Sequence, residues 1–301
     1  MSEVRRFQVK SLARVEGEGS LRVRIVDGTV EIAEFSIYEP PRFFEKLLCG
    51  REIREVPDLV ARICGICPVA YQLTACEALE KALGIAVTPD IRRLRRLLYC
   101  GEWIQSHALH VHLLHLPDFM GVESGFALAA TRPDLVNRGL RLKAIGSRIM
   151  EVVGGRAVHP VNVTVGGFYR APMAASVRGL LADLEWALGA AIDLVAEVSR
   201  LDFPGVPRDY DAVCLRPAAG YPLDEGRVVS TSGLDLDAAE YERHFSERQV
   251  PWSTALQSVM MPDARPYLVG PLARLNLCHD RLPQAARLAA EACGLGFPLR
   301  L

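Results

Sequence analysis

The sequence has little excess charge of either sign. Its 35 lysines and arginines and 36 aspartates and glutamates leave a formal net charge of −1, and both signs are mixed along the chain. Proteins that bind nucleic acids or anionic membranes present clustered basic side chains instead. We therefore expect neither a nucleic acid nor a membrane surface as a partner.

Long apolar runs are also absent. No uninterrupted run approaches the ~18 apolar residues of a membrane span, and the N-terminal region, where Arg5 and Arg6 precede polar residues, does not resemble a signal peptide. The eight cysteines are spaced irregularly, unlike those of a secreted disulfide framework. These absences predict a cytoplasmic protein whose thiols are mostly buried, with some available to bind metal.

The N-terminal region is predicted to be β-structure. Apolar and polar residues alternate over residues 21–25 and 30–32, on either side of Asp27-Gly28, and this dipeptide favours a tight hairpin turn. After Pro40-Pro41, residues 42–50 (RFFEKLLCG) resemble a short helix that Gly50 caps.

Most of the remaining chain is predicted to be helical. Segments in which apolar residues recur at intervals of three and four span residues 68–84, 89–117, 133–153 and 171–200. Thr88-Pro89 is a helix start signal, and Gly84 and Gly154-Gly155 are end signals. Residues 203–224 are predicted to be an irregular connection, followed by a short strand at 227–231 and a helix from about residue 238. We expect one domain over residues 1–301, with an α+β, mainly helical fold: a bundle of long helices with an N-terminal β-hairpin region.

The most reactive segment is 62–68 (RICGICP), where Cys64 and Cys67 stand just before a predicted helix. The helix N-terminus and the neighbouring Arg62 favour the thiolate form. Such a pair can bind a soft metal ion, form a reactive disulfide or supply half of a zinc site. A thioredoxin-like site is disfavoured because no βαβ pattern surrounds it, and a complete zinc site because no second CxxC follows.

The segment RICGICP resembles the first nickel-binding motif of the large subunits of [NiFe] hydrogenases, which split or form dihydrogen. Four further segments resemble that family in the same order: 13–19 (ARVEGEG), 101–121 (GEWIQSHALHVHLLHLPDFMG), 154–167 (GGRAVHPVNVTVGG) and 267–277 (YLVGPLARLNL). The resemblance implies the large-subunit fold. The RVEGEG and GGRAVHPVNV variants favour the soluble, cytoplasmic, NAD(P)-linked branch.

The resemblance also implies a metal centre. Cys64 would be a terminal nickel ligand and Cys67 would bridge nickel to an iron that carries carbonyl and cyanide ligands, inserted by maturation proteins. Glu45 would ligate a separate magnesium or iron ion through oxygen, although a solvated helix carboxylate is nearly as good an interpretation. Arg62 and His107 are expected to support the cofactor, His107 through hydrogen bonds.

Two carboxylates are implied to act in catalysis. Glu16 matches the family's proton-transferring glutamate, and Asp118 resembles an aspartate near the open side of the nickel-iron centre. Without the resemblance, Glu16 would be a surface carboxylate and Asp118 a turn residue that ends a helix. The expected partners are an iron-sulfur small subunit, which the segment around His159 would face, and flavin-containing diaphorase subunits.

Histidines 107, 110, 112 and 115 include pairs spaced three apart on a helix, a spacing that also suits metal ligands. A histidine on a packed helix is more often a core or interface residue, and the family does not use these as nickel ligands. We therefore expect structural roles, with His107 and His110 supporting the site by hydrogen bonds.

Two departures from the family stand out. Tyr71 occupies a position where the family usually has histidine, and the 301 residues contain no second CxxC, which in the family supplies the other nickel-iron thiolates. The chain thus resembles the N-terminal part of a large subunit, and we expect it to be inactive alone. The alternative is a non-catalytic scaffold or assembly subunit on the same fold, as in the related subunit of respiratory complex I.

Overall fold

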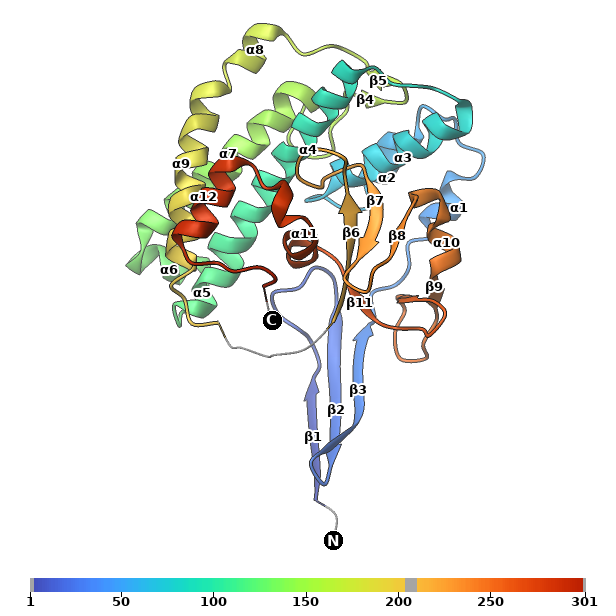
Figure 1. Cartoon of the computed structure of the whole chain (residues 1–301), viewed down its shortest axis with the longest axis vertical. Helices are drawn as coiled ribbons and strands as arrows, with labels where there is room; N and C mark the ends of the chain where they lie inside the picture. Colours follow the sequence, from blue (N-terminus) through green and yellow to red (C-terminus); the bar gives the residue numbers. More distant parts are fainter. Residues whose placement is uncertain (1–2, 204–209, 300–301) are drawn as a thin grey trace. The chain divides into compact units, whose positions relative to one another are not determined.

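The computed structural model describes residues 3–203 and 210–299, which separate into two compact units (Figure 1). The first unit combines the described residues up to Arg42 with those from residue 210 onward, and the second runs from Phe43 to Phe203. The predicted α+β, mainly helical fold class is confirmed, while the single-domain organisation stays a prediction. Within the described ranges, no helix is both long and apolar enough to cross a bilayer.

The first unit begins with a three-stranded antiparallel sheet. The strands pair in the order β1 (Val4–Val9), β2 (Gly19–Val26) and β3 (Thr29–Ile37). Asp27 and Gly28 form the turn between β2 and β3, with φ of 47° and 79°. A two-residue turn with both central residues in the left-handed region is the one that Asp-Gly favours. The predicted hairpin is therefore confirmed.

A second sheet of the first unit has the order β11-β6-β7-β8, and β9 pairs with β10. The elements are β6 (Asp211–Arg216), β7 (Arg227–Ser230), β8 (Asp235–Leu236), η2 (Ala238–Glu240), α10 (Tyr241–His244), β9 (Phe245–Arg248), β10 (Gln257–Met260), β11 (Tyr267–Leu268), α11 (Pro271–Cys278), η3 (His279–Arg281) and α12 (Gln284–Ala292). The predicted strand at 227–231 is confirmed. The prediction of an irregular connection over residues 203–224 was wrong for β6, a strand whose Ala212 and Val213 are buried. Residues 204–209 of that connection lie outside the described residues.

The second unit is a helix bundle with one small hairpin. Its elements are α1 (Phe44–Leu48), α2 (Val56–Ala61), α3 (Pro68–Leu83), α4 (Pro89–Leu109), the π-helix η1 (His110–His115), α5 (Leu116–Phe119), α6 (Gly125–Thr131), α7 (Pro133–Gly154), β4 (Val163–Thr164), β5 (Gly167–Phe168), α8 (Ala174–Arg178) and α9 (Leu181–Val198). The Thr88 hydroxyl accepts the Ile91 N–H at the start of α4, and Gly155, with φ of 87°, ends α7. These are the predicted helix boundaries.

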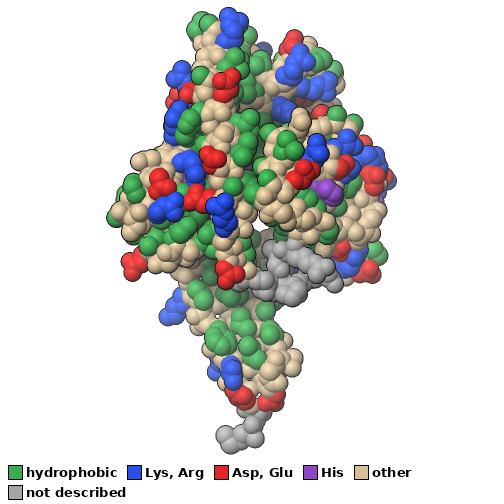
Figure 2. Space-filling view, turned by 60° about the vertical axis from the view of Figure 1, so that its left-hand side comes forward, with side chains coloured by type: hydrophobic (Ala, Val, Ile, Leu, Met, Phe, Trp, Pro, Cys, Tyr) green, Lys and Arg blue, Asp and Glu red, His purple; other side chains and the backbone are tan. Residues whose placement is uncertain are grey.

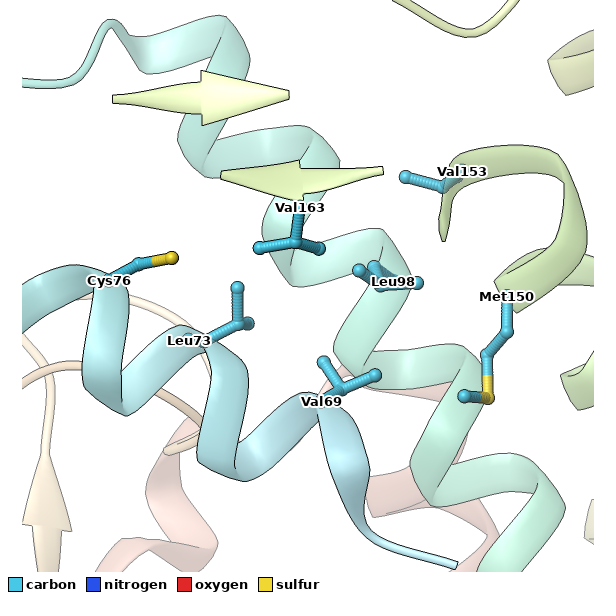
Figure 3. Packing of buried hydrophobic residues seen from close by; sticks show 7 residues of the cluster. All are labelled: Val69, Leu73, Cys76, Leu98, Met150, Val153 and Val163. Carbon is cyan, nitrogen blue, oxygen red and sulfur yellow. The ribbon is translucent and has the colours of Figure 1, made fainter. Parts of the chain in front are cut away.

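Helices α3, α4 and α7 share one apolar core. Its fully or nearly fully buried members are Val69, Leu73, Cys76, Leu98, Met150, Val153 and Val163, which point toward one another from the three helices and β4 (Figure 3). Burying each large apolar side chain contributes roughly 1.5–3 kcal/mol. This core fixes the start of α3, where the cysteine pair lies.

Glycines let α4 and α7 approach closely. A Cβ atom on Gly146 would lie 2.5 Å from the Gln105 nitrogen and 2.6 Å from the Gly101 oxygen. Both contacts are with backbone atoms, so no side-chain rotation could relieve them. The two helix backbones are therefore in direct contact at this crossing.

Two predicted helices differ from the structure. The helix over 171–200 is divided between α8 and α9, and Leu181 and Leu188 of its apolar stripe are 57% and 53% exposed. Figure 2 brings the side that carries α8 and α9 forward and shows hydrophobic side chains among charged ones. The helix over 89–117 contains the π-helix η1 just before Pro117. Proline cannot donate a backbone hydrogen bond, which favours an altered turn before it.

Candidate metal centre

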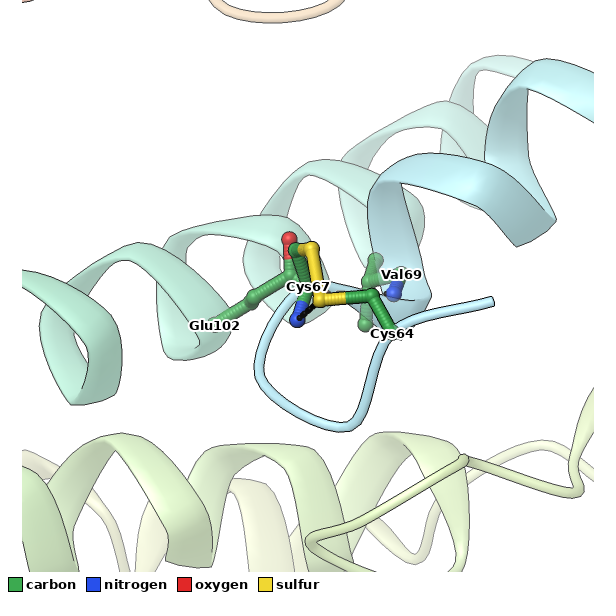
Figure 4. Close-up of a disulfide and its surroundings, with 4 residues drawn as sticks. All are labelled: Cys64, Cys67, Val69 and Glu102. Carbon is green, nitrogen blue, oxygen red and sulfur yellow. Dashed lines mark hydrogen bonds between the residues drawn. A yellow bond between two sulfur atoms is a disulfide. The ribbon is translucent and has the colours of Figure 1, made fainter. Parts of the chain in front are cut away.

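Cys64 and Cys67 lie on the loop that enters α3. Cys67 is the N-cap residue and Pro68 follows at the first helical position, where a missing N–H costs nothing. The Cα atoms are 5.4 Å apart, the sulfurs are joined as a disulfide, and the Cys67 N–H donates to the Cys64 Sγ at 3.0 Å (Figure 4). Both side chains are half-buried. The loop therefore brings both sulfurs to one point at a helix N-terminus.

The reduced form of this loop fits part of a soft-metal centre. The two thiolates are close enough together to bind a single ion, and the helix dipole stabilises their negative charge. Among residues 3–203 and 210–299, however, no group of three or more histidine, cysteine or acidic side chains is arranged to hold a metal ion. The loop alone thus supplies two of the sulfur donors that the predicted nickel-iron centre requires.

Glu102 of α4 reaches the first turn of α3, and it was not among the predicted site residues. Its Oε2 accepts the Val69 N–H at 2.6 Å, and the residue is 2% exposed. Burial raises the pKa of this carboxyl to about 7, against the hydrogen bonds from the Val69 and Ala70 amides, which lower it. Its position between Leu98 and Gln105 on the buried face of α4 was the one available signal.

Glu80 and Arg95 form a buried ion pair that joins α3 to α4. Arg95 Nη1 donates to Glu80 Oε2 at 2.9 Å, and the Gly166 N–H donates to Glu80 Oε1 at 2.7 Å. The two side chains are 6% and 8% exposed. Burial acts to raise the pKa of Glu80, but these hydrogen bonds and the Arg95 charge lower it overall. The pair therefore holds α3 in place as a charged unit.

Three other predicted site residues belong to the second unit. Arg62 donates to the Asp58 carboxylate at 3.1 Å, and both side chains are about half exposed. Glu45 is exposed in the first turn of α1, and Asp118 is exposed in α5. The described residues thus show their local settings, and their roles at the centre stay predictions.

Glu16 belongs to the first unit. It is exposed on the segment between β1 and β2, next to Gly17, whose φ is 78°. A Cβ atom on Gly17 would lie 2.5 Å from the Glu39 carboxylate, so the Glu39 side chain lies against the backbone at Gly17. The catalytic role of Glu16 also stays a prediction.

The four histidines of α4 and η1 have different environments. His107 is exposed, with Nδ1 2.7 Å from the Trp103 carbonyl oxygen. His112 is completely buried, its Nδ1 lies 3.0 Å from the Ala108 oxygen, and burial lowers its pKa. His110 and His115, five residues apart, contact each other through their Nε2 atoms at 3.0 Å. The contacting pair, His110 and His115, is therefore not one of the pairs spaced three apart that the sequence suggested.

Comparisons with known proteins point to one family. The nickel-dependent hydrogenase family matches residues 42–134. Sulfhydrogenase 1 subunit alpha of Pyrococcus furiosus is 33% identical over 287 residues, which are 94% of this chain and 66% of the relative. Sulfhydrogenase 2 subunit alpha of the same organism is 45% identical over 166 residues, which are 55% of this chain and 40% of the relative.

A solved structure agrees with these relatives. The structure of an NAD+-reducing [NiFe]-hydrogenase in the H2-reduced state shares 30% identity with this chain at a TM-score of 0.84. The match covers 97% of this chain and 70% of the other, whereas the chain spans 66% and 40% of the two curated relatives. Because fold and sequence agree over nearly the whole chain, this protein belongs to the nickel-dependent hydrogenase family, as a large (alpha) subunit of the [NiFe] type.

Proposed function

We propose that this protein is the large subunit of a hydrogenase that catalyses the reversible, heterolytic oxidation of dihydrogen. The observation that carries the proposal is the half-buried Cys64–Cys67 loop at the N-terminus of α3. Its sulfurs converge in the manner that a soft metal ion requires. Membership of the nickel-dependent hydrogenase family supports the same metal.

The bound nickel-iron centre would supply Lewis acidity and redox capacity. In the proposal, Cys64 would hold nickel, Cys67 would hold both nickel and iron, and the iron would carry carbonyl and cyanide ligands. The first peptide groups of α3 stabilise both sulfurs as thiolates. Glu102 fixes the first turn of α3 through Val69 and so orients the loop. Glu45 would hold a separate magnesium or iron ion.

Protons must leave the site when dihydrogen is cleaved. We assign this transfer to Glu16 and a supporting position near the centre to Asp118, while His107 and Arg62 support the cofactor. A carboxylate can accept and release a proton repeatedly when its pKa lies near the working pH. These assignments rest on the family motifs that contain the four residues.

Electrons must leave by another route. The proposed partners are an iron-sulfur small subunit and flavin-containing diaphorase subunits that reduce NAD(P), with maturation proteins needed to build the centre. The alpha-subunit names of the relatives support a multi-subunit assembly, and the NAD+-reducing structure at 30% identity supports the acceptor. The cytoplasmic location stays a prediction.

The test is to produce the protein with its small subunit and a maturation system, and to measure hydrogen-dependent NAD+ and NADP+ reduction. Infrared bands of iron-bound carbonyl and cyanide report the centre independently of turnover. We expect activity and bands only when the polypeptide also carries the family's second CxxC, which residues 1–301 lack. In that longer form Cys49→Ala, which changes an exposed thiol, should keep both and Cys64→Ala should lose both. A folded longer form without bands would favour the scaffold alternative.

A further inference from the structure

Residues 110–115 (HVHLLH) form a π-helical turn between α4 and α5. A π-helix bonds residue i to i+5, so side chains five apart lie one above the other, whereas an α-helix aligns those three and four apart. Pro117 cannot donate to the carbonyl of Leu113, four residues before it, and this favours a widened turn. The turn therefore places His110 and His115 on one face.

The two imidazoles converge on a common point. Their Nε2 atoms are 3.0 Å apart, their ring centroids are 4.2 Å apart and their planes are inclined by 52°. Because the centroids are only slightly farther apart than the nitrogens, the rings meet at an angle and do not lie end to end. His110 is exposed and His115 half-buried, so neither residue is enclosed in the core.

The distance between the nitrogens selects a coordination geometry. Two imidazole nitrogens at about 2.0–2.1 Å from one ion lie about 3 Å apart when the angle at the metal is about 90°, and about 3.4 Å apart when it is tetrahedral. The observed 3.0 Å fits the right angle. Square-planar and octahedral sites of copper and nickel provide that angle, whereas structural zinc sites are tetrahedral.

We propose that His110 and His115 form a metal site for a divalent ion with adjacent ligands at a right angle, Ni²⁺ or Cu²⁺, with water in the remaining positions. The site shares no ligand with the Cys64–Cys67 loop. In the metal-free chain the two rings share a hydrogen bond between these nitrogens. A divalent ion would replace the shared proton and bind the same two nitrogens, which the hydrogen bond already holds close together.

The experiment is a calorimetric titration of the purified chain with Ni²⁺ and, separately, with Zn²⁺ at neutral pH. Serine replaces Cys49, Cys64 and Cys67 in every variant, so that the exposed thiol and the CxxC pair cannot bind the metals. His110→Ala and His115→Ala each remove one proposed ligand. His107→Ala is the matched control, because this exposed histidine lies one turn away and its Nδ1 contacts the Trp103 oxygen.

We expect one Ni²⁺ site per chain, bound more tightly than Zn²⁺. His110→Ala and His115→Ala should each weaken it ~10-fold or more, while His107→Ala should change it less than either. His110→Gln, which keeps a polar side chain on the exposed face, should weaken it as His110→Ala does. Full affinity in both His110 variants, an equal loss in His107→Ala, or tighter Zn²⁺ binding would overturn the proposal. Circular dichroism would confirm that each variant is folded.

Discussion

Glu102 of α4 accepts a hydrogen bond from the backbone N–H of Val69, two residues beyond Cys67, at 2.6 Å. A buried carboxyl thus holds the first turn of the helix that presents the cysteine pair. Residues 33 apart in the sequence meet here because α3 and α4 share the core that contains Val69 and Leu98. The position of the cysteine loop therefore depends on α4 as well as on α3.

Glu102 should make the stability of the metal-free chain depend on pH. Its pKa in the folded chain is raised from 4.5 to about 7, so the folded state binds the proton more tightly than the unfolded state does. The resulting stabilisation is fully present below pH 4.5 and is lost as pH rises through 7, by about 3 kcal/mol in all. Glu102→Gln cannot ionise, so its unfolding free energy should lack this loss.

Urea denaturation at several pH values would measure the difference between Glu102→Gln and the natural chain. Glu151→Gln serves as the control, because Glu151 is an exposed carboxylate on α7. Parallel pH curves for Glu102→Gln and the natural chain would show that burial does not perturb this carboxyl.

Gly146→Ala should destabilise the helix bundle. The new Cβ atom would lie 2.5 Å and 2.6 Å from backbone atoms of α4, so the two helices must separate. Overpacking of this kind costs about 1–3 kcal/mol. The control is Gly189→Ala in α9, where the new Cβ would have no described atom within 4 Å apart from its own stretch of helix. Gly189→Ala should instead stabilise the folded chain by about 0.5–1 kcal/mol, because glycine inside a helix loses more conformational freedom on folding than alanine does. Equal denaturation midpoints for the two variants would contradict the close crossing.

Glu80→Gln should lower the free energy of unfolding far more than Glu77→Gln, a neighbouring change on the same helix. It leaves the buried Arg95 without its charged partner, which typically costs about 3–5 kcal/mol. Glu77→Gln breaks an exposed pair with Lys81 and should cost less than about 1 kcal/mol. Thermal and chemical unfolding of both variants would measure the contrast. Similar losses would mean that the Glu80–Arg95 pair is effectively solvated.

Glu16→Gln tests the proposed proton route in the assembled enzyme. The amide keeps the shape of the side chain but cannot carry a proton, so hydrogen/deuterium exchange should fall by about 10²-fold or more. The infrared bands of the centre should remain. Glu18→Gln changes a second exposed carboxylate of the same motif and should leave exchange unaltered. Unchanged exchange in Glu16→Gln would show that protons leave by another route.

Local sequence signals predicted much of the fold. Asp27-Gly28 marked the hairpin, Thr88-Pro89 the start of α4, and Gly84 and Gly155 the ends of α3 and α7. Each signal acts on the backbone within a few residues, through a preset φ angle or a capping hydrogen bond. Such elements form with little dependence on the rest of the chain.

The missed features depend on distant contacts. β6 follows a proline-rich stretch and is a strand because β7 and β11 pair with its two edges. Glu102 meets Val69 only once α3 packs on α4, and helical spacing alone could not predict the π-turn that joins His110 to His115. The sequence identified the cysteine pair itself, because CxxC before a helix is a local pattern.

The most direct test of the nickel assignment is the nickel content of the purified, matured protein in a form that also carries the family's second CxxC. We predict that Cys64→Ala and Cys67→Ala each lose nickel, because each removes a thiolate that water replaces poorly. Cys49→Ala, which alters an exposed free thiol, should retain it. Elemental analysis of the three variants beside the natural protein gives the answer. A full nickel complement in either Cys64→Ala or Cys67→Ala would contradict the assignment of this loop as the nickel site.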